Sequence, residues 1–328
     1  MKNENIQPVT IERLHDSVYA SFALLAAMQL DLFTGLSGHE RTSNQLASSM
    51  GVNPEKLPPL LYALVSISLL CAEDGRFSNS DEAERYLVRG RETFIGDRHL
   101  LWSELWQAAM QTAETVRTGE PSTERNFSTM STEEQTPYFN GLHPRAVATG
   151  KAFATSHDLS PYHSILDIGG GSGGFAIGMA QICAGLRITV ADVPSVIPIA
   201  RRFISEAGLV DRIDLLPVDV LREELQGSYD VVILKNILQV FSSEEAQRAL
   251  RNVRNALAPG GHIFIMGDIL EDSRISPRDT ATFNLAFINI YKSGQTYTRG
   301  EYRSWLSGAG FTEVTFLSEE TITAISPA

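Results

Sequence analysis

The stretch that decides the fold is SILDIGGGSGG, residues 164–174, an apolar run followed by a glycine-rich loop. The run 165–168 is typical of a short buried strand, and residues 175–182 after the loop are typical of a helix. The loop fits two patterns, G-x-G-x-x-G and D-x-G-x-G-x-G. In both patterns glycine is needed because the loop turns tightly and a ligand approaches its backbone too closely for a Cβ. The loop predicts a nucleotide-containing ligand and leaves its identity open.

Asp167, at the end of this strand, distinguishes between a ligand with a pyrophosphate and a ligand with a positive charge. A pyrophosphate needs helix-terminal N–H groups and no anion beside it, whereas a cationic sulfonium ligand with an amino-acid part is attracted by a carboxylate. Asp167 therefore favours a cationic nucleoside.

Strands and helices alternate through the rest of this half of the chain. Such alternation predicts βαβ units, and hence a parallel sheet covered on both faces. The two closing strands, joined by a short link, are expected to pair antiparallel. The fold class is thus α/β, a Rossmann-like domain with a mostly parallel seven-stranded sheet and an antiparallel C-terminal hairpin. The strands after the first are expected at 187–191, 213–217, 229–234, 262–266, 313–317 and 321–325, and the helices at 196–207, 244–256 and 299–309.

Four strands in this half each end in a polar residue: Asp167, Asp192, Asp219 and Lys235. Open parallel sheets bind ligands at the carboxyl ends of their strands, so these side chains are expected in one crevice. Asp192 lies about 20 residues past the loop, where an acid can accept hydrogen bonds from both ribose hydroxyls.

The first hundred residues follow a winged-helix pattern. Residues 17–36 are apolar on nearly every side of a helix, which indicates a core or a subunit interface. Two short helices follow, starting near Thr42 and Asn53, and residues 70–78 form a hairpin with an Asp-Gly turn. DNA binding and dimerisation are both compatible with this pattern. Dimerisation is favoured, because Lys56 is the single cation of the second helix and the formal charge of the chain is −12, from 27 Lys+Arg and 39 Asp+Glu.

A helical, aromatic-rich connector joins the two halves. Trp106, Tyr138 and Phe139 are candidates for the roof of a cleft that binds a planar apolar substrate, with ordinary core filling as the alternative. The expected division is a winged-helix dimerisation domain over 1–95, the connector over 96–160 and a catalytic domain over 161–328.

Other features of the sequence bear on location and metals. The apolar stretch at 22–30 is far short of the roughly 20 residues that cross a bilayer, and the N-terminus has no apolar signal segment. A cytoplasmic protein with no membrane partner is therefore expected. Cys71 and Cys183 are expected to be core thiols, and no His or Cys pair has metal-ligand spacing.

From about residue 164 onward the chain resembles class I S-adenosylmethionine-dependent methyltransferases. Over its whole length it resembles small-molecule O-methyltransferases with an N-terminal winged-helix dimerisation domain. The segments that carry the resemblance are LDIGGGSG at 166–173, ADVPSVI at 191–197, DV at 219–220, LKNIL at 234–238 and LAPGG at 257–261.

The resemblance implies a homodimer that binds S-adenosylmethionine, releases S-adenosylhomocysteine and takes a small-molecule substrate, with no nucleic-acid partner. It implies that the backbone of Gly169, Gly171 and Gly173 faces the methionine part of the cofactor, beside Asp167. By the same resemblance Asp192, with Val193 next to it, holds the ribose, and Asp219 and Val220 flank the adenine. Lys235 matches a family position near the adenine end.

The family's catalytic base is missing. The resembling enzymes have a histidine in a Leu-His-Asp-Trp segment after the fourth strand, and this chain has Gln239 in LQVF at 238–241. Glutamine cannot take up a proton, although its amide can orient a substrate. The family's two flanking acids fall on Gly267 and Thr296.

Three interpretations remain open. One is a methyltransferase whose acceptor needs no strong base, such as an amine, an enolic carbon or an ionised hydroxyl, or whose base comes from elsewhere. The second is an enzyme that keeps the cofactor and catalyses a pericyclic reaction, hydroxylation or decarboxylation. The third is a binding or regulatory module. We expect the first, with O-, N- or C-methylation of an aromatic or polyketide-like secondary metabolite.

Other residues are candidates for proton handling and substrate binding. His143 and His157 lie on the segment that enters the catalytic domain, and a surface or loop-capping role is the alternative for each. Amides on otherwise apolar elements either pair in the core or meet a polar ligand, because an unpaired buried amide costs about 1–3 kcal/mol. The candidate substrate-binding residues outside the connector are Asn236, Asn284, Phe287 and Tyr291.

Overall fold

The computed structural model describes residues 6–91 and 93–327. The chain divides into two compact units, Met1–Ser103 and Glu104–Ala328, and the boundary falls within helix α6 (His99–Ala109). Each unit has its own hydrophobic core.

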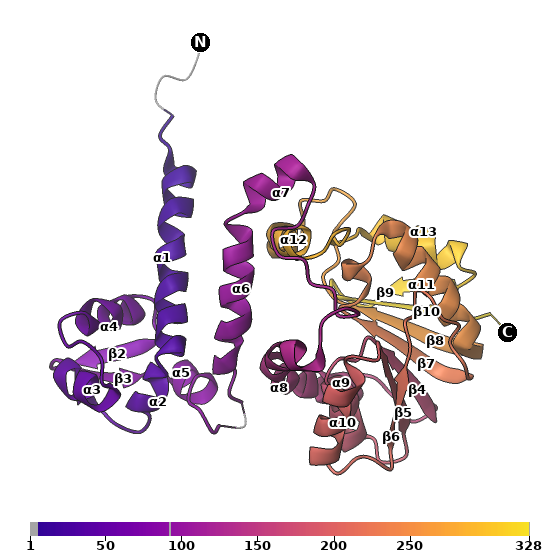
Figure 1. Cartoon of the computed structure of the whole chain (residues 1–328), viewed down its shortest axis with the longest axis horizontal. Coiled ribbons are helices and arrows are strands. Elements are labelled where there is room, and N and C mark those ends of the chain that lie inside the picture. Colours follow the sequence, from indigo (N-terminus) through magenta and orange to yellow (C-terminus); the bar gives the residue numbers. More distant parts are fainter. Residues whose placement is uncertain (1–5, 92, 328) are drawn as a thin grey trace. The chain divides into compact units, whose positions relative to one another are not determined.

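The N-terminal unit combines helices with a small antiparallel sheet (Figure 1). The strand order of this sheet is β1-β3-β2. The predicted hairpin is confirmed, because β2 pairs antiparallel with β3 through the turn at Asp74 and Gly75. The elements are α1 (Val9–Gln29), α2 (Leu32–Leu36), β1 (Arg41–Thr42), α3 (Ser43–Met50), α4 (Leu57–Ser66), β2 (Leu70–Glu73), β3 (Arg76–Asn79), α5 (Asp81–Tyr86) and a 3-10 turn at Gly96–Arg98.

The expectation of one helix over 17–36 is wrong. The helix starts at Val9, ends at Gln29, and is followed by α2 after a break at Asp31. Asp31 has a left-handed backbone with φ 52°, and its carboxylate accepts a hydrogen bond of 2.7 Å from the Thr34 hydroxyl. This local hydrogen bond helps an aspartate to occupy a conformation that interrupts a helix.

Helix α1 is also less buried in the single chain than expected. Only Ala23, Ala27 and Met28 are buried. The large apolar side chains that α1 leaves exposed are Val9, Ile11, Leu14, Val18, Tyr19 and Phe22. Such a continuous exposed apolar face is typical of an interaction surface.

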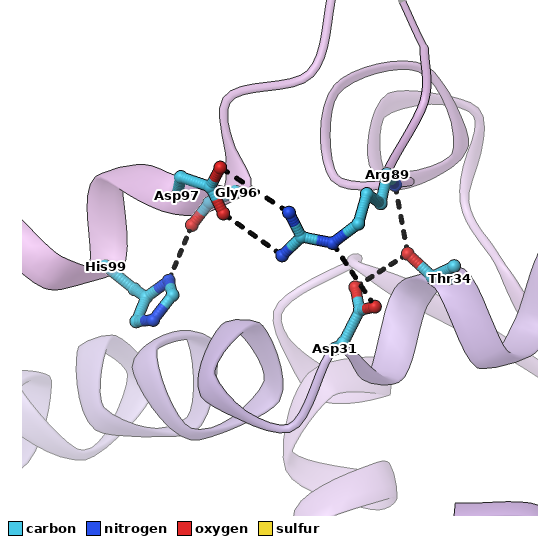
Figure 2. Close-up of polar contacts among 6 residues, drawn as sticks. All are labelled: Asp31, Thr34, Arg89, Gly96, Asp97 and His99. Atoms are coloured by element: carbon cyan, nitrogen blue, oxygen red, sulfur yellow. Dashed lines mark hydrogen bonds and ion pairs between the residues drawn. The ribbon is translucent and has the colours of Figure 1, made fainter. Parts of the chain in front are cut away.

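In the N-terminal unit, Arg89 is the centre of a network of polar contacts (Figure 2). The Arg89 guanidinium pairs with Asp97 at 3.0 Å and with Asp31 at 3.5 Å, and the Arg89 backbone N–H donates to the Thr34 hydroxyl at 2.9 Å. The segment after α5 is thereby attached to α2. The ion pairs are half exposed, so each contributes at most about 1 kcal/mol.

The C-terminal unit is built on a seven-stranded sheet of order β6-β5-β4-β7-β8-β10-β9 (Figure 1). The first five strands in this order are parallel, and the last two join antiparallel, which confirms the predicted fold class. The strands are β4 (Ser164–Ile168), β5 (Arg187–Asp192), β6 (Ile213–Pro217), β7 (Tyr229–Lys235), β8 (Leu257–Met266), β9 (Thr312–Phe316) and β10 (Thr321–Ile325).

Alternate residues of the central strands face two separate cores. Leu166 and Val232 belong to the core that includes residues of α11 (Ser243–Ala256) and α13 (Arg299–Gly308). Ile165 and Val231 belong to the core that includes residues of α8 (Thr132–Ser156), α9 (Gly174–Ile182) and α10 (Ile197–Glu206). This alternation, with period two, explains why each strand reads as a continuous apolar run.

Helix α8 ties the connector to the sheet by packing closely on α9. A Cβ at Gly150 would lie 2.1 Å from the carbonyl oxygen of Phe175, and one at Gly178 would lie 2.2 Å from that of Val147. Only glycine allows this approach. The remaining helices are α7 (Thr112–Thr118) and α12 (Arg278–Ile290), which contact each other, and a 3-10 turn at Leu238–Val240.

Across residues 6–91 and 93–327, no helix combines the length and the apolar character that a bilayer span requires.

Candidate cofactor and acceptor site

The glycine loop between β4 and α9 is held against β5. The Gly169 N–H donates to the Ala191 carbonyl at 2.8 Å, and Gly169, Gly171 and Gly173 have φ of 68°, 58° and 71°. A Cβ at Gly169 would lie 2.4 Å from the Ile237 side chain, and one at Gly171 would lie 2.7 Å from the Phe139 ring. Backbone conformation and space both require glycine in this loop.

Asp192, at the end of β5, reaches back to the loop. Its Oδ2 accepts from the Gly171 N–H and its Oδ1 from the Val193 N–H, both at 2.8 Å. Burial raises the pKa of Asp192 to about 6, while the two backbone N–H groups act to lower it. A carboxylate oxygen can accept more than one hydrogen bond, so both oxygens can still accept from ribose hydroxyls.

Asp167 is 1% exposed, and its Oδ2 has no hydrogen-bond partner among the described residues. Burial raises the pKa of Asp167 to about 7, the Lys235 ammonium opposes the rise, and the Asp192 carboxylate adds to it. An unpartnered buried carboxylate is costly, and a cationic ligand with N–H donors would relieve that cost. Asp167, Asp192 and the glycine loop therefore fit S-adenosylmethionine.

The Lys235 side chain lies near α9, whereas the Asp219 carboxylate is bonded within its own loop. The Lys235 ammonium lies 5.9 Å from the centre of the Phe175 ring, on the side of the sheet that α9 covers. Burial lowers the pKa of Lys235, and Asp167 raises it. The Asp219 carboxylate accepts from the Leu221 N–H at 3.0 Å and pairs with Arg222 at 3.3 Å, so it is turned into its own loop. Of the four strand-end residues, Asp167 interacts electrostatically with both Lys235 and Asp192.

Val193 and Val220, the candidate cofactor-binding residues that follow Asp192 and Asp219 in the chain, are apolar. Val193 is partly buried against the cluster of Phe139, Val196 and Ile199. Val220 is buried in the core that contains Leu166.

Gln239 is 2% exposed and lies on the 3-10 turn after β7. A Cβ at Gly267 would lie 2.1 Å from the Gln239 Nε2 and 2.8 Å from the Asn236 Oδ1. The Gln239 backbone carbonyl oxygen lies 2.6 Å from where a Cβ of Gly294 would be. The Gln239 amide thus occupies space that a side chain at position 267 would need.

Of the other candidate amides, Asn236 lies at this point, and Asn284 is hydrogen-bonded to Thr296. Asn236 is exposed and has a left-handed backbone with φ 55°. Asn284 uses its Oδ1 to accept from the Thr296 N–H at 2.8 Å. Thr296 is fully buried, and its Oγ1 has no partner in the described part of the chain.

Phe287 and Tyr291 stack with ring centres 6.1 Å apart. Tyr291 itself lies just beyond the end of α12, in an extended conformation. The aromatic side chains Phe127, Tyr138 and Phe139 form a second group, with ring centres 5.1–5.4 Å apart. Trp106 is partly buried on α6.

The two candidate histidines have their contacts away from Gln239. His143 Nδ1 lies 2.9 Å from the Ser172 hydroxyl, and its ring stacks on Phe203 with centres 3.7 Å apart. Burial, with a smaller effect of Arg202, lowers the pKa of His143 to about 4. His157 Nδ1 lies 3.0 Å from the Phe153 carbonyl oxygen at the end of α8. His143 thus supports the glycine loop, and His157 caps a helix.

The structure adds two residues that the sequence did not single out, Arg125 and Glu104. The Arg125 side chain is 4% exposed and forms an ion pair with Glu104, and its guanidinium lies 4.4 Å from the centre of the Tyr138 ring. No local pattern marks Arg125, because its burial results from segments that are distant in sequence. Nowhere in the described ranges do three His, Cys, Asp or Glu side chains gather as metal ligands.

Comparison with known proteins places this geometry in context. The chain matches the family model of the O-methyltransferase domain over residues 114–312 and that of the O-methyltransferase dimerisation domain over residues 12–89. It is 28% identical over 313 residues to 3-hydroxy-5-methyl-1-naphthoate 3-O-methyltransferase of Streptomyces sahachiroi, covering 94% of this chain and 90% of that one. It is 30% identical to acetylserotonin O-methyltransferase of Bos taurus, covering 90% and 89%. The crystal structure of human N-acetylserotonin methyltransferase in complex with SAM superposes with a TM-score of 0.86 at 22% identity, covering all of both chains.

Proposed function

The chain belongs to the family of S-adenosylmethionine-dependent O-methyltransferases that carry an N-terminal dimerisation domain, and on this basis we propose that it methylates a hydroxyl of a small aromatic or polyketide-like metabolite. It is a methyltransferase, and S-adenosylmethionine is its cofactor. The relative from Streptomyces sahachiroi acts on a hydroxynaphthoate, which supports a fused aromatic acceptor.

The cofactor supplies a methyl group on a sulfonium sulfur, which keeps the bonding electron pair when the methyl leaves. Asp167 offers its buried carboxylate to the cationic part of the cofactor, and Asp192 offers both oxygens to the ribose. The other proposed cofactor residues are Val193, Asp219, Val220 and Lys235. To bind the cofactor, the Asp219 carboxylate has to turn away from the Leu221 N–H to which it is bonded.

The single observation that defines the reaction is the amide of Gln239 in place of a base, fitted against Gly267. The two side chains that meet at this point, the amides of Gln239 and Asn236, cannot take a proton, so we infer that the acceptor hydroxyl arrives already ionised. The Gln239 Nε2 then donates a hydrogen bond to the oxyanion and orients it. An O–CH3 bond forms, an S–CH3 bond breaks, and the negative charge of the oxygen cancels the positive charge of the sulfur, so no proton has to move.

The connector is proposed to supply part of the acceptor pocket. Phe139 lies against the glycine loop, and Tyr138 is its neighbour. Asn236, Asn284, Phe287, Tyr291 and Trp106 are the other proposed acceptor contacts. We propose His143 and His157 as positioning residues and not as proton carriers. The His143 ring contacts the Ser172 hydroxyl of the glycine loop, and the His157 ring contacts a carbonyl oxygen at the end of α8.

The dimerisation domain supports self-association of the chain. We propose the exposed apolar face of α1 as part of that interface. A cytoplasmic location and the absence of a nucleic-acid partner remain predictions, for which the formal charge of −12 argues. The comparisons lend no support to a non-methylating enzyme or a regulatory module.

Two measurements test the proposal. Calorimetric titration with S-adenosylhomocysteine should show binding to the wild type and at least tenfold weaker binding to Asp192→Asn, which loses the charge that accepts the ribose hydroxyls. Asp214→Asn, at an exposed carboxylate, is the matched control. Transfer of a labelled methyl group should favour acidic aromatic hydroxyls over simple phenols and amines. Conversion of an acceptor without label would contradict the proposal.

A further inference from the structure

Arg125 is a buried cation that the proposed reaction does not use. Its side chain is 4% exposed, and its backbone N–H donates to the Ile290 carbonyl at 2.8 Å, which attaches the loop between α7 and α8 to the end of α12. A buried guanidinium stays charged, and burying it is unfavourable unless it is paired and hydrogen-bonded.

The surroundings of Arg125 contain more hydrogen-bond donors than acceptors. Glu104 pairs with one guanidinium nitrogen, and its own side chain is 42% exposed. The guanidinium lies over the ring of Tyr138 at 4.4 Å and within hydrogen-bonding range of the phenol groups of Tyr138 and Tyr291. Burial raises the pKa of both phenols, so both stay protonated and can donate. Tyr138 and Tyr291 also hydrogen-bond to each other, and their phenol oxygens accept from the guanidinium. Five guanidinium N–H groups and two phenol O–H groups thus share the Glu104 carboxylate and the two phenol oxygens as acceptors, so donors outnumber acceptors.

This donor cluster, defined as Arg125, Tyr138 and Tyr291, is connected through neighbouring residues to the cofactor loop and to Gln239. On one side, Tyr138 packs edge-to-face on Phe139, which lies against Gly171. On the other side, the Tyr291 Cβ is 2.8 Å from where a Cβ of Gly294 would be, and that point is 2.6 Å from the Gln239 carbonyl oxygen. A planar molecule bound with its hydroxyl at Gln239 can therefore direct its far end to the donor cluster.

We propose that the donor cluster binds the carbonyl oxygen of an acceptor whose hydroxyl is conjugated with that carbonyl, and so keeps the hydroxyl ionised in place of a base. This inference rests on the proposed function. Ionisation of such an acceptor spreads the negative charge over both oxygens. A cation and two donors at the carbonyl end stabilise the anion and lower the pKa of the hydroxyl at the other end. The cluster thus compensates for the missing histidine.

The pKa of a bound acceptor tests this proposal without turnover. The probe is 6-hydroxy-2-naphthaldehyde, whose ionised form absorbs at longer wavelength, titrated from pH 5 to 10 with S-adenosylhomocysteine present. The wild type should lower the probe's pKa by about one unit or more, which corresponds to at least tenfold tighter binding of the anion than of the neutral form. Tyr291→Phe and Tyr138→Phe, which keep the rings, should each lose part of this shift. 2-Naphthol, which lacks the carbonyl, should bind the wild type and these variants alike.

Charge variants separate recognition from stability. Arg125→Gln should abolish the shift, whereas Glu104→Gln removes the competing carboxylate and should lower the bound pKa further. Because Arg125→Gln can unfold, the phenol variants and Glu104→Gln decide the question, with thermal melting as the control. If the folded variants bind the aldehyde with an unchanged pKa, the cluster is structural and the proposal is wrong. A different outcome is a shift of the probe's pKa that depends on the donor cluster, without any methyl transfer. That outcome would contradict the proposed function and would still support the donor cluster as a site that binds the carbonyl of an anion.

Discussion

The amide nitrogen of Gln239 lies 2.1 Å from the position that a Cβ of residue 267 would occupy. Gly267 also has φ of 147°, which disfavours any other residue. The two residues are therefore matched: an acid at position 267 would displace the amide. The position of the Gln239 amide therefore requires glycine at position 267.

Gly267→Ala should lower kcat/KM at least tenfold and destabilise the fold by about 1–3 kcal/mol, because the new Cβ strains the backbone and displaces the Gln239 amide. Affinity for S-adenosylhomocysteine should stay the same. Gly185→Ala, at an exposed glycine with open space around it, is the matched control. Steady-state kinetics and thermal melting measure both effects, and a fully active Gly267→Ala enzyme would show that the amide position is unimportant.

Gln239→Glu and Gln239→Leu distinguish an ionised acceptor from one that needs a base. Gln239→Leu should lower kcat about 10²-fold or more, because it removes a donor to the oxyanion. Gln239→Glu has the same shape and should be worse still, because its carboxylate repels an ionised acceptor. If Gln239→Glu is instead more active than Gln239→Leu, the acceptor arrives protonated. Gln239→His alone should give no gain on simple phenols, because positions 267 and 296 carry no acid to hold the imidazole.

Asp167 should make the cofactor-free protein less stable as the pH rises. Its pKa in the folded state is raised to about 7 from 3.8, so the folded state binds more protons and its stabilising contribution is lost as the pH rises through about 7. Asp167→Asn should therefore melt about 2–4 °C above the wild type at pH 8, and the difference should shrink toward pH 4. The same variant should bind S-adenosylmethionine more weakly. Equal melting temperatures at pH 8 would show that Asp167 is stabilised by charges other than those described.

Leu14→Asp on α1 should convert a dimer into monomers, because a carboxylate would be buried in an apolar interface. Light scattering with size-exclusion chromatography measures the mass. Leu317→Asp, at a leucine of the C-terminal unit that is 47% exposed against 55% for Leu14, is the control. A dimeric Leu14→Asp variant would place the interface elsewhere.

The sequence by itself determined the features whose causes are local. The apolar run and glycines at 164–174 specify a strand and a tight turn, and the strand–helix alternation specifies a parallel sheet, since right-handed crossovers leave few other topologies. The Asp74-Gly75 pair specifies the hairpin of the N-terminal unit. The absence of a histidine base was equally visible, because it is a property of one position.

Only the tertiary structure decided features that depend on segments brought together from far apart. The burial of Arg125 among Glu104, Tyr138 and Tyr291 needs four segments of the chain. The engagement of His143 with the glycine loop and the turning of Asp219 into its own loop likewise follow from packing and from competing hydrogen-bond partners. The match of Gln239 to Gly267 depends on the close approach of the turn after β7 to the residue that follows β8. Periodicity shows which face of an element is buried, whereas the partner that buries it is set by the summed packing of the whole unit.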